Sequence, residues 1–329
     1  MSGAGRGAIG VDLGGTNVRA ALVRDDGAII RSLHRPAAWD PATYANLEDS
    51  LGVLVSMVEE LARAPEAAAL ALVGVGVGVT GQINRRGEFV GGKGPRGAYH
   101  GAVPVRDLLG AAFELPVWVD NDSKAATWGE YLYGAGRGAN SVIGITIGTG
   151  IGGGIVLDGR LFHGAMGLAG HLGFMTIDMH GPRDVCGVVG HLERYASGTG
   201  MARAAQDALR GGAQSMIRDL VSGRIERVTG ETVFAALHQD DPLARSIVEG
   251  AARALGLGIA SLIHLFNPDR VIVGGGVAEQ GAVFLDPVKR IVREHTLINF
   301  DQTPIHAAEL GDAAGVIGAA ALCWQPSAP

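Results

Sequence analysis

Two glycine-rich loops, each placed directly after an apolar run, constrain this chain more than any other feature of its sequence. The first loop is Asp12-Leu13-Gly14-Gly15-Thr16-Asn17 and the second is Ile147-Gly148-Thr149-Gly150-Ile151-Gly152-Gly153-Gly154. Each pattern predicts a strand that ends in a tight turn, where glycine lets backbone N–H groups close on an anion. Thr16 and Thr149 add hydroxyl donors, and Asp12 can hold a hydrated Mg²⁺. Together the loops are typical of a site for a nucleoside triphosphate.

Neither loop matches a better-known nucleotide motif. No Gly-Lys-Ser/Thr follows the first loop, which argues against a Walker P-loop. Gly148, Gly150 and Gly153 fit the pattern G-x-G-x-x-G, but that motif requires a helix next. Residues 154–161 instead predict a β-hairpin with an Asp-Gly turn. Since either loop alone could be an ordinary hairpin turn, the hypothesis of a nucleotide site depends on their occurring together.

Composition favours a soluble protein of two domains. Its 329 residues exceed the usual size of one hydrophobic core. A net charge of −6 without a basic stretch argues against nucleic acid as a partner. Cys186 and Cys323 cannot form a disulfide framework, and the most apolar stretch, residues 67–79, is too short to cross a bilayer. We therefore expect a cytoplasmic protein without a signal peptide or a membrane partner.

The order of predicted elements repeats along the chain. The first half predicts strands at 8–13, 18–24 and 28–34, a helix over about 41–64, a strand at 70–79, a helix at 105–113 and a strand at 116–119. The second half predicts strands at 141–147, 153–157 and 160–163, long helices at 197–219 and 242–266, a strand at 270–274, a helix near 283–294, a strand at 305–310 and a closing helix at 313–323. Each glycine loop follows the first strand of its half. We therefore predict two α/β lobes around a cleft, formed by residues 1–119 plus 312–329 and by residues 120–311.

Six short motifs then occur in a characteristic order. They are Asp12-Leu-Gly-Gly-Thr-Asn17, Thr80-Gly81-Gln82-Ile83, Asn121-Asp122-Ser-Lys-Ala-Ala-Thr-Trp-Gly-Glu130, Gly148-Thr-Gly-Ile-Gly-Gly-Gly154, Asn267-Pro268-Asp-Arg-Val-Ile-Val-Gly274-Gly-Gly276 and Gly311-Asp312-Ala-Ala-Gly-Val-Ile-Gly-Ala-Ala320. In this order they resemble the ROK family of bacterial sugar kinases and sugar-sensing repressors, over about residues 8–322. The resemblance implies an α/β, two-lobed actin/hexokinase-like (ribonuclease H-like) fold with duplicated βββαβαβα lobes. It also implies a homodimer.

The resemblance assigns roles to single residues. Asp122 matches the family's catalytic base, which takes the proton of the attacking hydroxyl. Gly81, Asn121 and Glu193 are expected on the sugar side of the site. The residues expected to bind ATP and its Mg²⁺ are Asp12, Gly14, Gly15, Thr16, Asn17, Gly148, Thr149, Gly150, Gly274, Gly275 and Gly276. From the residues alone, Asn121-Asp122 could instead cap a helix that starts at Ser123, and residues 274–276 could form a strand-to-helix turn.

The chain departs from the family where the family binds structural zinc and part of the sugar. The family pattern A-G-E-x-G-H, followed by C-x-C-G-x-x-G-C-x-E, aligns with residues 169–174 and 184–193, so the four zinc positions hold Phe174, Asp184, Cys186 and His191. Phe cannot bind zinc, whereas Asp, Cys and His can. We expect no structural zinc, with a rebuilt site of Asp184, Cys186 and His191 as the alternative. His171 replaces a sugar-binding Glu of the family.

The sequence thus predicts a kinase that uses ATP and Mg²⁺ to phosphorylate the primary hydroxyl of a hexose or a hexose-like acceptor. The altered sugar-binding segment leaves a cyclitol or a modified sugar open as the acceptor. A non-catalytic sugar sensor is the alternative from another class. We expect no repressor, because the first loop starts at Asp12 and leaves no room before it for a helix-turn-helix domain. The phosphoryl donor, whether ATP, another triphosphate or polyphosphate, also stays open.

Overall fold

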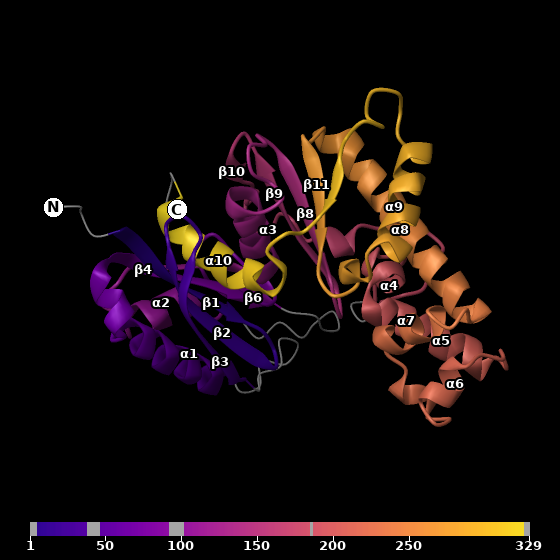
Figure 1. Cartoon of the computed structure of the whole chain (residues 1–329), viewed down its shortest axis with the longest axis horizontal. Coiled ribbons are helices and arrows are strands. Elements are labelled where there is room, and N and C mark those ends of the chain that lie inside the picture. The colour runs from indigo at the N-terminus through magenta and orange to yellow at the C-terminus, as the bar shows by residue number, and fades with distance from the viewer. Residues whose placement is uncertain (1–4, 38–46, 92–101, 185–186, 326–329) are drawn as a thin grey trace. The chain divides into compact units, whose positions relative to one another are not determined.

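The structure is a computed structural model that describes residues 5–37, 47–91, 102–184 and 187–325. The chain divides into two compact units (Figure 1). Unit 1 comprises residues 1–140, 154–170 and 309–329, and unit 2 comprises residues 141–153 and 171–308. Two five-stranded sheets and one small two-stranded sheet run through the described residues.

The sheet of unit 1 has the strand order β3-β2-β1-β4-β7. Strands β1 (Gly5–Leu13), β2 (Asn17–Arg24) and β3 (Ile29–Pro36) form antiparallel pairs, whereas β4 (Leu70–Val79) and β7 (Val117–Asn121) run parallel to β1. Short turns join the antiparallel strands, and helical segments precede both parallel strands, as each kind of pairing requires. The three parallel strands therefore end at one edge of the sheet.

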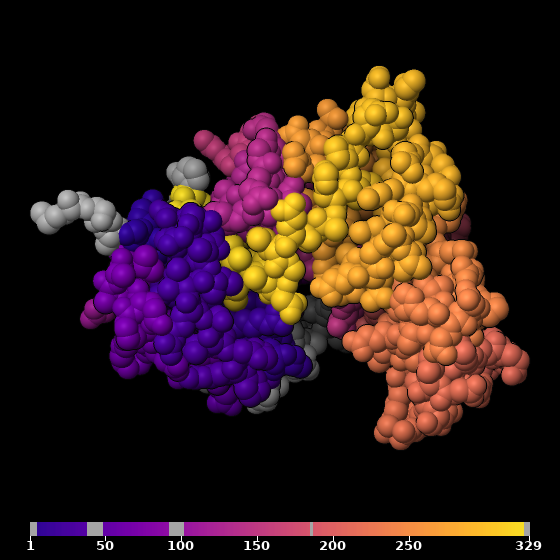
Figure 2. Space-filling model, in the orientation of Figure 1, coloured from indigo at the N-terminus to yellow at the C-terminus, as the bar shows by residue number. Residues whose placement is uncertain are grey.

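The C-terminal helix α10 (Ala314–Ala321) packs on one face of this sheet. Val316 and Ala320 share a buried cluster with Ala8 of β1. Figure 2 shows the yellow C-terminal residues beside the indigo N-terminal residues. Glycine permits this contact, because a Cβ at Gly76 or at Gly10 would overlap the backbone of α10. The C-terminal helix α10 thus completes a hydrophobic core that β1 and β2 begin.

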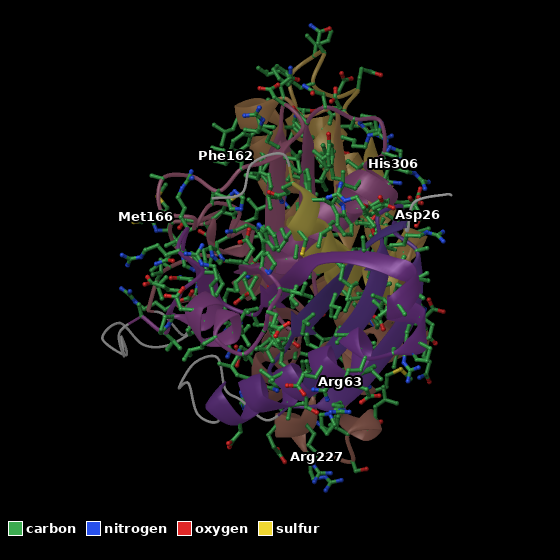
Figure 3. The ribbon with its side chains drawn as sticks, turned by 90° about the vertical axis from the view of Figure 1, so that its left-hand side faces the viewer. Asp26, Arg63, Phe162, Met166, Arg227 and His306 are labelled. Atoms are coloured by element: carbon green, nitrogen blue, oxygen red, sulfur yellow. The ribbon has the colours of Figure 1, made fainter. Side chains whose placement is uncertain are left out.

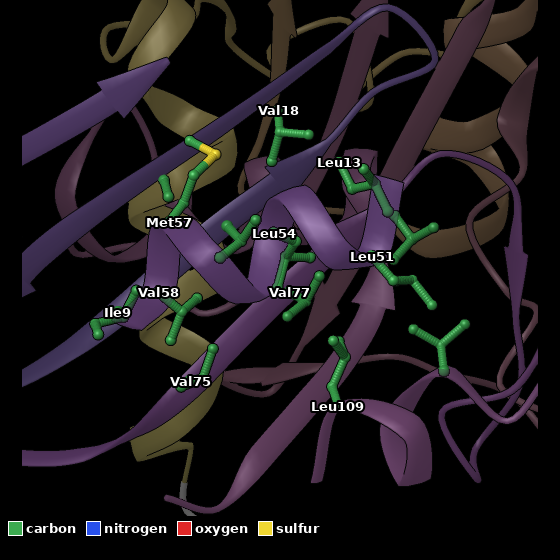
Figure 4. Close-up of a cluster of buried hydrophobic side chains, with 14 of the residues drawn as sticks. Ile9, Leu13, Val18, Leu51, Leu54, Met57, Val58, Val75, Val77 and Leu109 are labelled. Atoms are coloured by element: carbon green, nitrogen blue, oxygen red, sulfur yellow. The ribbon is translucent and has the colours of Figure 1, made fainter. Parts of the chain in front are cut away.

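Helix α1 (Leu47–Ala62) covers the other face. Its apolar residues recur at helical spacing and meet the alternate side chains of the strands (Figure 4). The cluster includes Ile9, Leu13, Val18, Leu51, Leu54, Met57, Val58, Val75, Val77 and Leu109, none more than 6% exposed. Each such side chain contributes roughly 1.5–3 kcal/mol relative to exposure. Helix α2 (Val105–Gly110) and the small sheet of β5 (Gln82–Ile83) and β6 (Phe89–Gly91) extend this core.

The second large sheet has the order β10-β9-β8-β11-β12. Strands β8 (Val142–Ile147) and β12 (Ile305–Ala307) both run parallel to β11 (Arg270–Gly274) in unit 2. Strand β9 (Ile151–Leu157) passes from unit 2 into unit 1 after residue 153, and β10 (Arg160–Leu161) pairs with it antiparallel. The order repeats that of the first sheet strand for strand, so the predicted duplication is confirmed.

Helix α3 (Asp122–Tyr133) belongs to unit 1, and unit 2 contains α4 (Glu193–Ala196), α5 (Gly198–Arg210), α6 (Ile217–Leu220), α7 (Gly230–Leu237), α8 (Pro242–Phe266) and α9 (Ala282–His295). Helices α8 and α9 lie where the sequence predicted them, whereas α4 and α7 were not predicted. Helix α8 starts after its cap Asp241 and stops at Asn267 in the left-handed conformation. Among the described residues, α8 is the helix long and apolar enough to cross a membrane. Because 61% of its most apolar window is buried inside the protein, it has the burial of a core helix.

Several predicted bounds are wrong. The helix predicted at 197–219 is two helices, because the chain turns at residues 211–212, where Gly212 has φ +90°. The strand predicted at 305–310 ends at residue 307, because the N–H groups of Glu309 and Leu310 donate to the Glu130 carboxylate and not to a strand. The helix predicted at 105–113 ends at residue 110, where a turn to Ala112 closes it. The helix predicted at 41–64 spans 47–62, and residues 38–46 lie outside the described residues.

The compact units have other bounds than the predicted lobes. Residues 120–140 cluster with unit 1 because α3 packs against α10, and residues 154–170 cluster there too. These units are defined by packing alone. The lobes of residues 1–119 plus 312–329 and of residues 120–311 stay a prediction.

We expect Gly76→Ala to destabilise the protein by about 1–3 kcal/mol, because its Cβ has no room between β4 and α10. Gly250→Ala is the matched control, since nothing lies within 4 Å of a Cβ at this position of α8. It should stabilise by about 0.5–1 kcal/mol. Urea unfolding followed by circular dichroism measures both. Equal effects of the two substitutions would contradict the close contact of α10.

Candidate active site

The carboxyl edge of the first sheet carries the predicted catalytic residues. Leu13, Val79 and Asn121 lie side by side in the register of β1, β4 and β7. The carboxyl ends of parallel strands are the usual place for ligands in α/β proteins. Asp12 precedes this row and Asp122 follows it. Unit 1 therefore brings together two carboxylates that are 110 positions apart in the sequence.

Asp122 is part-buried at the first position of α3, and hydrogen bonds hold its carboxylate. Oδ1 accepts from the Ser123 N–H at 2.6 Å and from Asn121 Nδ2 at 2.8 Å. Oδ2 accepts from the Thr80 hydroxyl at 2.7 Å. Burial raises the pKa of Asp122, and the hydrogen bonds from Thr80 and Ser123 offset only part of that rise. A carboxyl group with a raised pKa in a fixed orientation suits a general base.

Asn121 caps helix α3 and also flanks the base. Its Oδ1 accepts from the N–H groups of Ser123 and Lys124, each at 3.1 Å. Its Nδ2 donates to the Gly81 carbonyl at 2.9 Å and to Asp122 Oδ1. These four bonds use both donors and both acceptor positions of the amide. The capping role that the sequence left open is confirmed, and the sugar contact of Asn121 stays a prediction.

The first glycine loop turns β1 into β2 beside this edge. The Gly14 N–H donates to the Asn17 carbonyl at 3.0 Å, and Asn17 Nδ2 donates to the Thr16 hydroxyl at 3.1 Å. Gly14 and Gly15 are half-buried, whereas Thr16 and Asn17 are exposed. The loop thus presents a hydroxyl and an amide to solvent, and these groups can bind phosphate oxygens.

Asp12 has the electrostatics of a cation ligand. Burial, and then the charge of Asp122, raise its pKa to about 7, against the opposing charge of Arg19. Within the described part of the chain, no hydrogen bond to the Asp12 carboxylate is present. A carboxylate in this state gains from a nearby cation, and Mg²⁺ prefers such oxygen ligands, often through water. Asp12 therefore fits the predicted magnesium site.

The residues predicted to bind ATP in the second half of the chain come together within unit 2. The Gly148 N–H donates to the Gly150 carbonyl at 2.9 Å and closes the second glycine loop. Gly275 has φ +86°, and a Cβ there would contact the backbone of Ile147, the residue before that loop. Both glycine segments thus lie at the carboxyl edge of β8 and β11. Their backbone geometry permits the close approach of a ligand.

Glu193 holds the residue that follows the second loop. Its Oε2 accepts from the Ile151 N–H at 2.8 Å, directly after the loop. The Gly198 N–H at the start of α5 donates to the Gly148 carbonyl at 2.9 Å. Glu193 therefore has a structural partner in unit 2, and its predicted sugar contact stays a prediction.

The segment predicted to lack zinc contains three aromatic rings in contact, tilted against one another. The Phe174 ring centroid lies 6.0 Å from that of His171 and 5.4 Å from that of His191. His191 Nδ1 is 2.5 Å from Asp184 Oδ2, so two of the three candidate ligands bind each other. Cys186, the third, lies outside the described residues. Where the structure describes the chain, no three metal-binding side chains come together. The absence of structural zinc and the alternative site that includes Cys186 both stay predictions.

The sequence reasoning missed a buried ionic network around Asp122. The side chains of Asp120 and Lys124 are 7% and 1% exposed, and Lys124 Nζ lies 3.0 Å from Asp120 Oδ1. His163 Nε2 lies 2.7 Å from Asp120 Oδ2, and Lys124 also donates to the Gly167 carbonyl. Burial alone would raise the pKa of Asp120, but the His163 hydrogen bond and the Lys124 charge lower it. Acidic and basic residues placed two positions before and after Asp122 were the available sequence signal.

This network fastens residues 162–167 to the start of α3. Arg85 strengthens the attachment, because its guanidinium donates twice to the Gly164 carbonyl, at 2.9 and 2.6 Å, and its N–H donates to the Met166 carbonyl at 3.1 Å. Phe162 and Met166 themselves are exposed (Figure 3). Four residues after this segment comes His171, at the position where the sequence predicts altered sugar binding.

Lys124→Met should lower the free energy of unfolding by about 3–5 kcal/mol, because it leaves Asp120 buried without its cation. Lys124→Met combined with Asp120→Asn should cost less than Lys124→Met alone. Lys289→Met on α9, a half-buried lysine, is the control and should stay within about 0.5 kcal/mol of wild type. Urea denaturation compares the four proteins. An effect of Lys124→Met as small as that of the control would show that the ion pair contributes nothing.

Comparison with known proteins gives the relationship directly. The ROK family profile matches residues 8–325. A glucokinase of Streptomyces coelicolor is 34% identical over 97% of this chain and 98% of its own, and one of Thermotoga maritima is 33% identical over 95% and 96%. The crystal structure of a ROK family glucokinase from Streptomyces griseus, in complex with glucose and AMPPNP, has a TM-score of 0.79 at 32% identity and covers 96% of this chain and 98% of that one. The fold is therefore the two-lobed actin/hexokinase-like fold, and the chain belongs to the ROK family.

Proposed function

We propose that this ATP-dependent carbohydrate kinase transfers the γ-phosphate to the primary hydroxyl of a hexose or a hexose-like acceptor, with Asp122 as the general base. The observation that carries the proposal is the carboxylate of Asp122, which is part-buried, oriented by neighbours and has a raised pKa. Relatives named glucokinase, and a relative that binds glucose and AMPPNP, support a sugar acceptor and ATP as the donor.

The environment of Asp122 suits proton transfer. Its ionised carboxylate would accept the proton of the acceptor hydroxyl while that oxygen attacks the γ-phosphate. The raised pKa brings the proton affinity of the base closer to the operating pH, which improves general-base catalysis. Holding the carboxylate in one orientation removes an entropic cost from the step.

The nucleotide would be held by the two glycine loops. In unit 1, Thr16 and Asn17 offer a hydroxyl and an amide to phosphate oxygens, and Asp12 would hold hydrated Mg²⁺, which supplies charge neutralisation to the phosphates when bound. In unit 2, Thr149 is expected at the phosphates and residues 274–276 at the adenosine. We expect the working enzyme to be a cytoplasmic homodimer without structural zinc.

Asp122→Asn should lower kcat by about 10²–10⁴ while the fold and ATP binding stay intact. Only the ionised carboxylate accepts a proton, so wild-type kcat should fall as the pH drops through the raised pKa of Asp122. The midpoint of that fall should lie at a pH above the ordinary carboxyl pKa of about 4. The asparagine variant should lack this acid limb. Coupled ADP release from pH 5 to 9, with nucleotide titration as the control, tests the assignment. Near-normal turnover of the variant would remove Asp122 from the mechanism.

The altered sugar-binding segment favours an acceptor other than glucose. A site that hydrogen-bonds a hydroxyl discriminates by up to about 10⁴–10⁵, whereas an apolar wall gives only about 10–200-fold. Phe174, whose ring contacts those of His171 and His191, offers such a wall. This observation supports a cyclitol or a modified sugar as the second candidate acceptor.

An ADP-release panel of glucose, glucosamine, N-acetylglucosamine and myo-inositol should show glucose as a mediocre substrate in kcat/KM. His171→Glu combined with Phe174→His should improve glucose relative to the preferred acceptor, with non-additive single effects. Melting temperatures identify variants that fail to fold. Glucose with kcat/KM above about 10⁴ M⁻¹s⁻¹ and ahead of every other acceptor would contradict the changed acceptor. Glucose binding without ADP release from any acceptor would indicate the sugar sensor.

A further inference from the structure

The two oxygens of the Asp122 carboxylate have different hydrogen-bond partners. Oδ1 is bonded to three donors: the Ser123 N–H at 2.6 Å, Asn121 Nδ2 at 2.8 Å and the Ser123 hydroxyl at 3.2 Å. Within the described residues, Oδ2 is bonded only to the Thr80 hydroxyl, at 2.7 Å. A carboxylate offers about two acceptor positions on each oxygen. Oδ1 is therefore saturated, and Oδ2 retains one position.

Thr80 is itself anchored on both sides. Its N–H donates to the Leu13 carbonyl at 3.2 Å, which ties the end of β4 to the end of β1. The next residue, Gly81, has φ +120°, and its carbonyl accepts from Asn121 Nδ2 at 2.9 Å. A Cβ at Gly81 would overlap the Phe89 ring, so this turn requires glycine. The Thr80 hydroxyl thus projects from a fixed backbone, and a β-branched side chain has few rotamers.

No cationic side chain in the described part of the chain is bound to Oδ2 of Asp122. Among the described residues Asp122 forms no ion pair, and the Lys124 ammonium at the same helix end is bound to Asp120 and the Gly167 carbonyl. Asp12, the charged group facing Asp122 from β1, has the same sign and repels it. The short O–H···O contact with Thr80 has the length of a charge-assisted hydrogen bond.

We infer that Thr80 is a positioning residue for phosphoryl transfer, whose hydroxyl holds Oδ2 of Asp122 so that its remaining lone pair meets the acceptor hydroxyl. The inference rests on the proposed role of Asp122 as the base. It identifies Oδ2 as the proton-accepting atom, since Oδ1 has no position left. It also gives a role to the first residue of the Thr80-Gly81-Gln82-Ile83 motif, which the predicted site omitted.

Thr80→Val removes the hydroxyl at almost constant volume, and Thr80→Ser keeps it. With ATP, Mg²⁺ and the fastest acceptor of the panel above, Thr80→Val should lower kcat about 10- to 100-fold, the range expected for one hydrogen bond to a charged group. KM for ATP and for the acceptor should stay within about 3-fold, because substrate binding is untouched. Thr80→Ser should stay within about 3-fold of wild-type kcat.

Thr127→Val is the matched control, because its hydroxyl donates at 2.8 Å to the Ser123 carbonyl within α3 and does not touch Asp122. Its kcat should stay within about 3-fold of wild type. Thr80→Ala replaces Thr80→Val if the melting temperature shows that the valine variant is unfolded at the assay temperature. The expected ranking of kcat is then the same.

A double-mutant cycle separates an action through Asp122 from any other effect of Thr80. In an Asp122→Ala background, Thr80→Val should change the residual kcat by less than about 3-fold, because no Oδ2 is left to hold. A full additional loss in that background would overturn the inference. So would Thr80→Val with wild-type kcat beside a slow Asp122→Ala, an outcome that leaves Asp122 as the base. Thr80→Ser as slow as Thr80→Val would also overturn it, by assigning the effect to shape. Normal turnover of Asp122→Ala would instead overturn the proposed base, and this inference with it.

Discussion

Three carboxylates lie largely out of water at one place in unit 1: Asp120 near the end of β7, and Asp122 and Glu130 on α3. Other segments of unit 1 supply their hydrogen-bond partners. Asp120 binds the ammonium of Lys124 and the ring of His163. Asp122 takes its hydrogen bonds from Thr80, Asn121 and Ser123. Glu130, only 4% exposed, accepts from the backbone N–H groups of residues 135, 309 and 310. A buried carboxylate without such partners costs several kcal/mol, so these bonds fix the positions of segments far apart in the sequence.

The nature of the hydrogen-bond partners separates Asp122, the predicted base, from its neighbour Asp120. Asp120 has a cationic partner, which with the His163 hydrogen bond lowers its pKa despite burial. Asp122 has only neutral donors, and burial raises its pKa. Two carboxyl groups two residues apart are thereby pushed in opposite directions, which is the usual way a protein assigns different roles to similar groups. Asp120 suits a permanent charge that holds structure, and Asp122 suits a group that gains and loses a proton.

What the sequence could predict depended on local pattern. The bounds of β4, α8 and β11 followed from apolar runs, caps and glycine. The glycine loops gave the predicted phosphate sites of each half, which stay predictions. The interactions that were missed join residues distant in the chain. Thr80 meets Asp122 across 42 positions, and His163 meets Asp120 across 43. The strand predicted at 305–310 was too long because Glu130, about 180 positions away, takes the N–H groups that would have continued it. No periodicity or capping rule carries such information.

The arrangement of partners also explains how the predicted sugar-binding segment can differ from the family pattern while the surroundings of Asp122 are kept. The donors to Asp122 come from β4, β7 and α3, whereas Phe174 contacts His171 and His191, and His191 is bonded to Asp184. The two sets share no side chain. Replacing a family His by Phe174 therefore leaves every bond to Asp122 in place. Lys124 holds the segment before His171 by a hydrogen bond to the Gly167 carbonyl. Because this bond is made to the backbone, it does not depend on the side chains of that segment. This construction lets the predicted sugar-binding segment vary without disturbing the hydrogen bonds to the predicted base, Asp122.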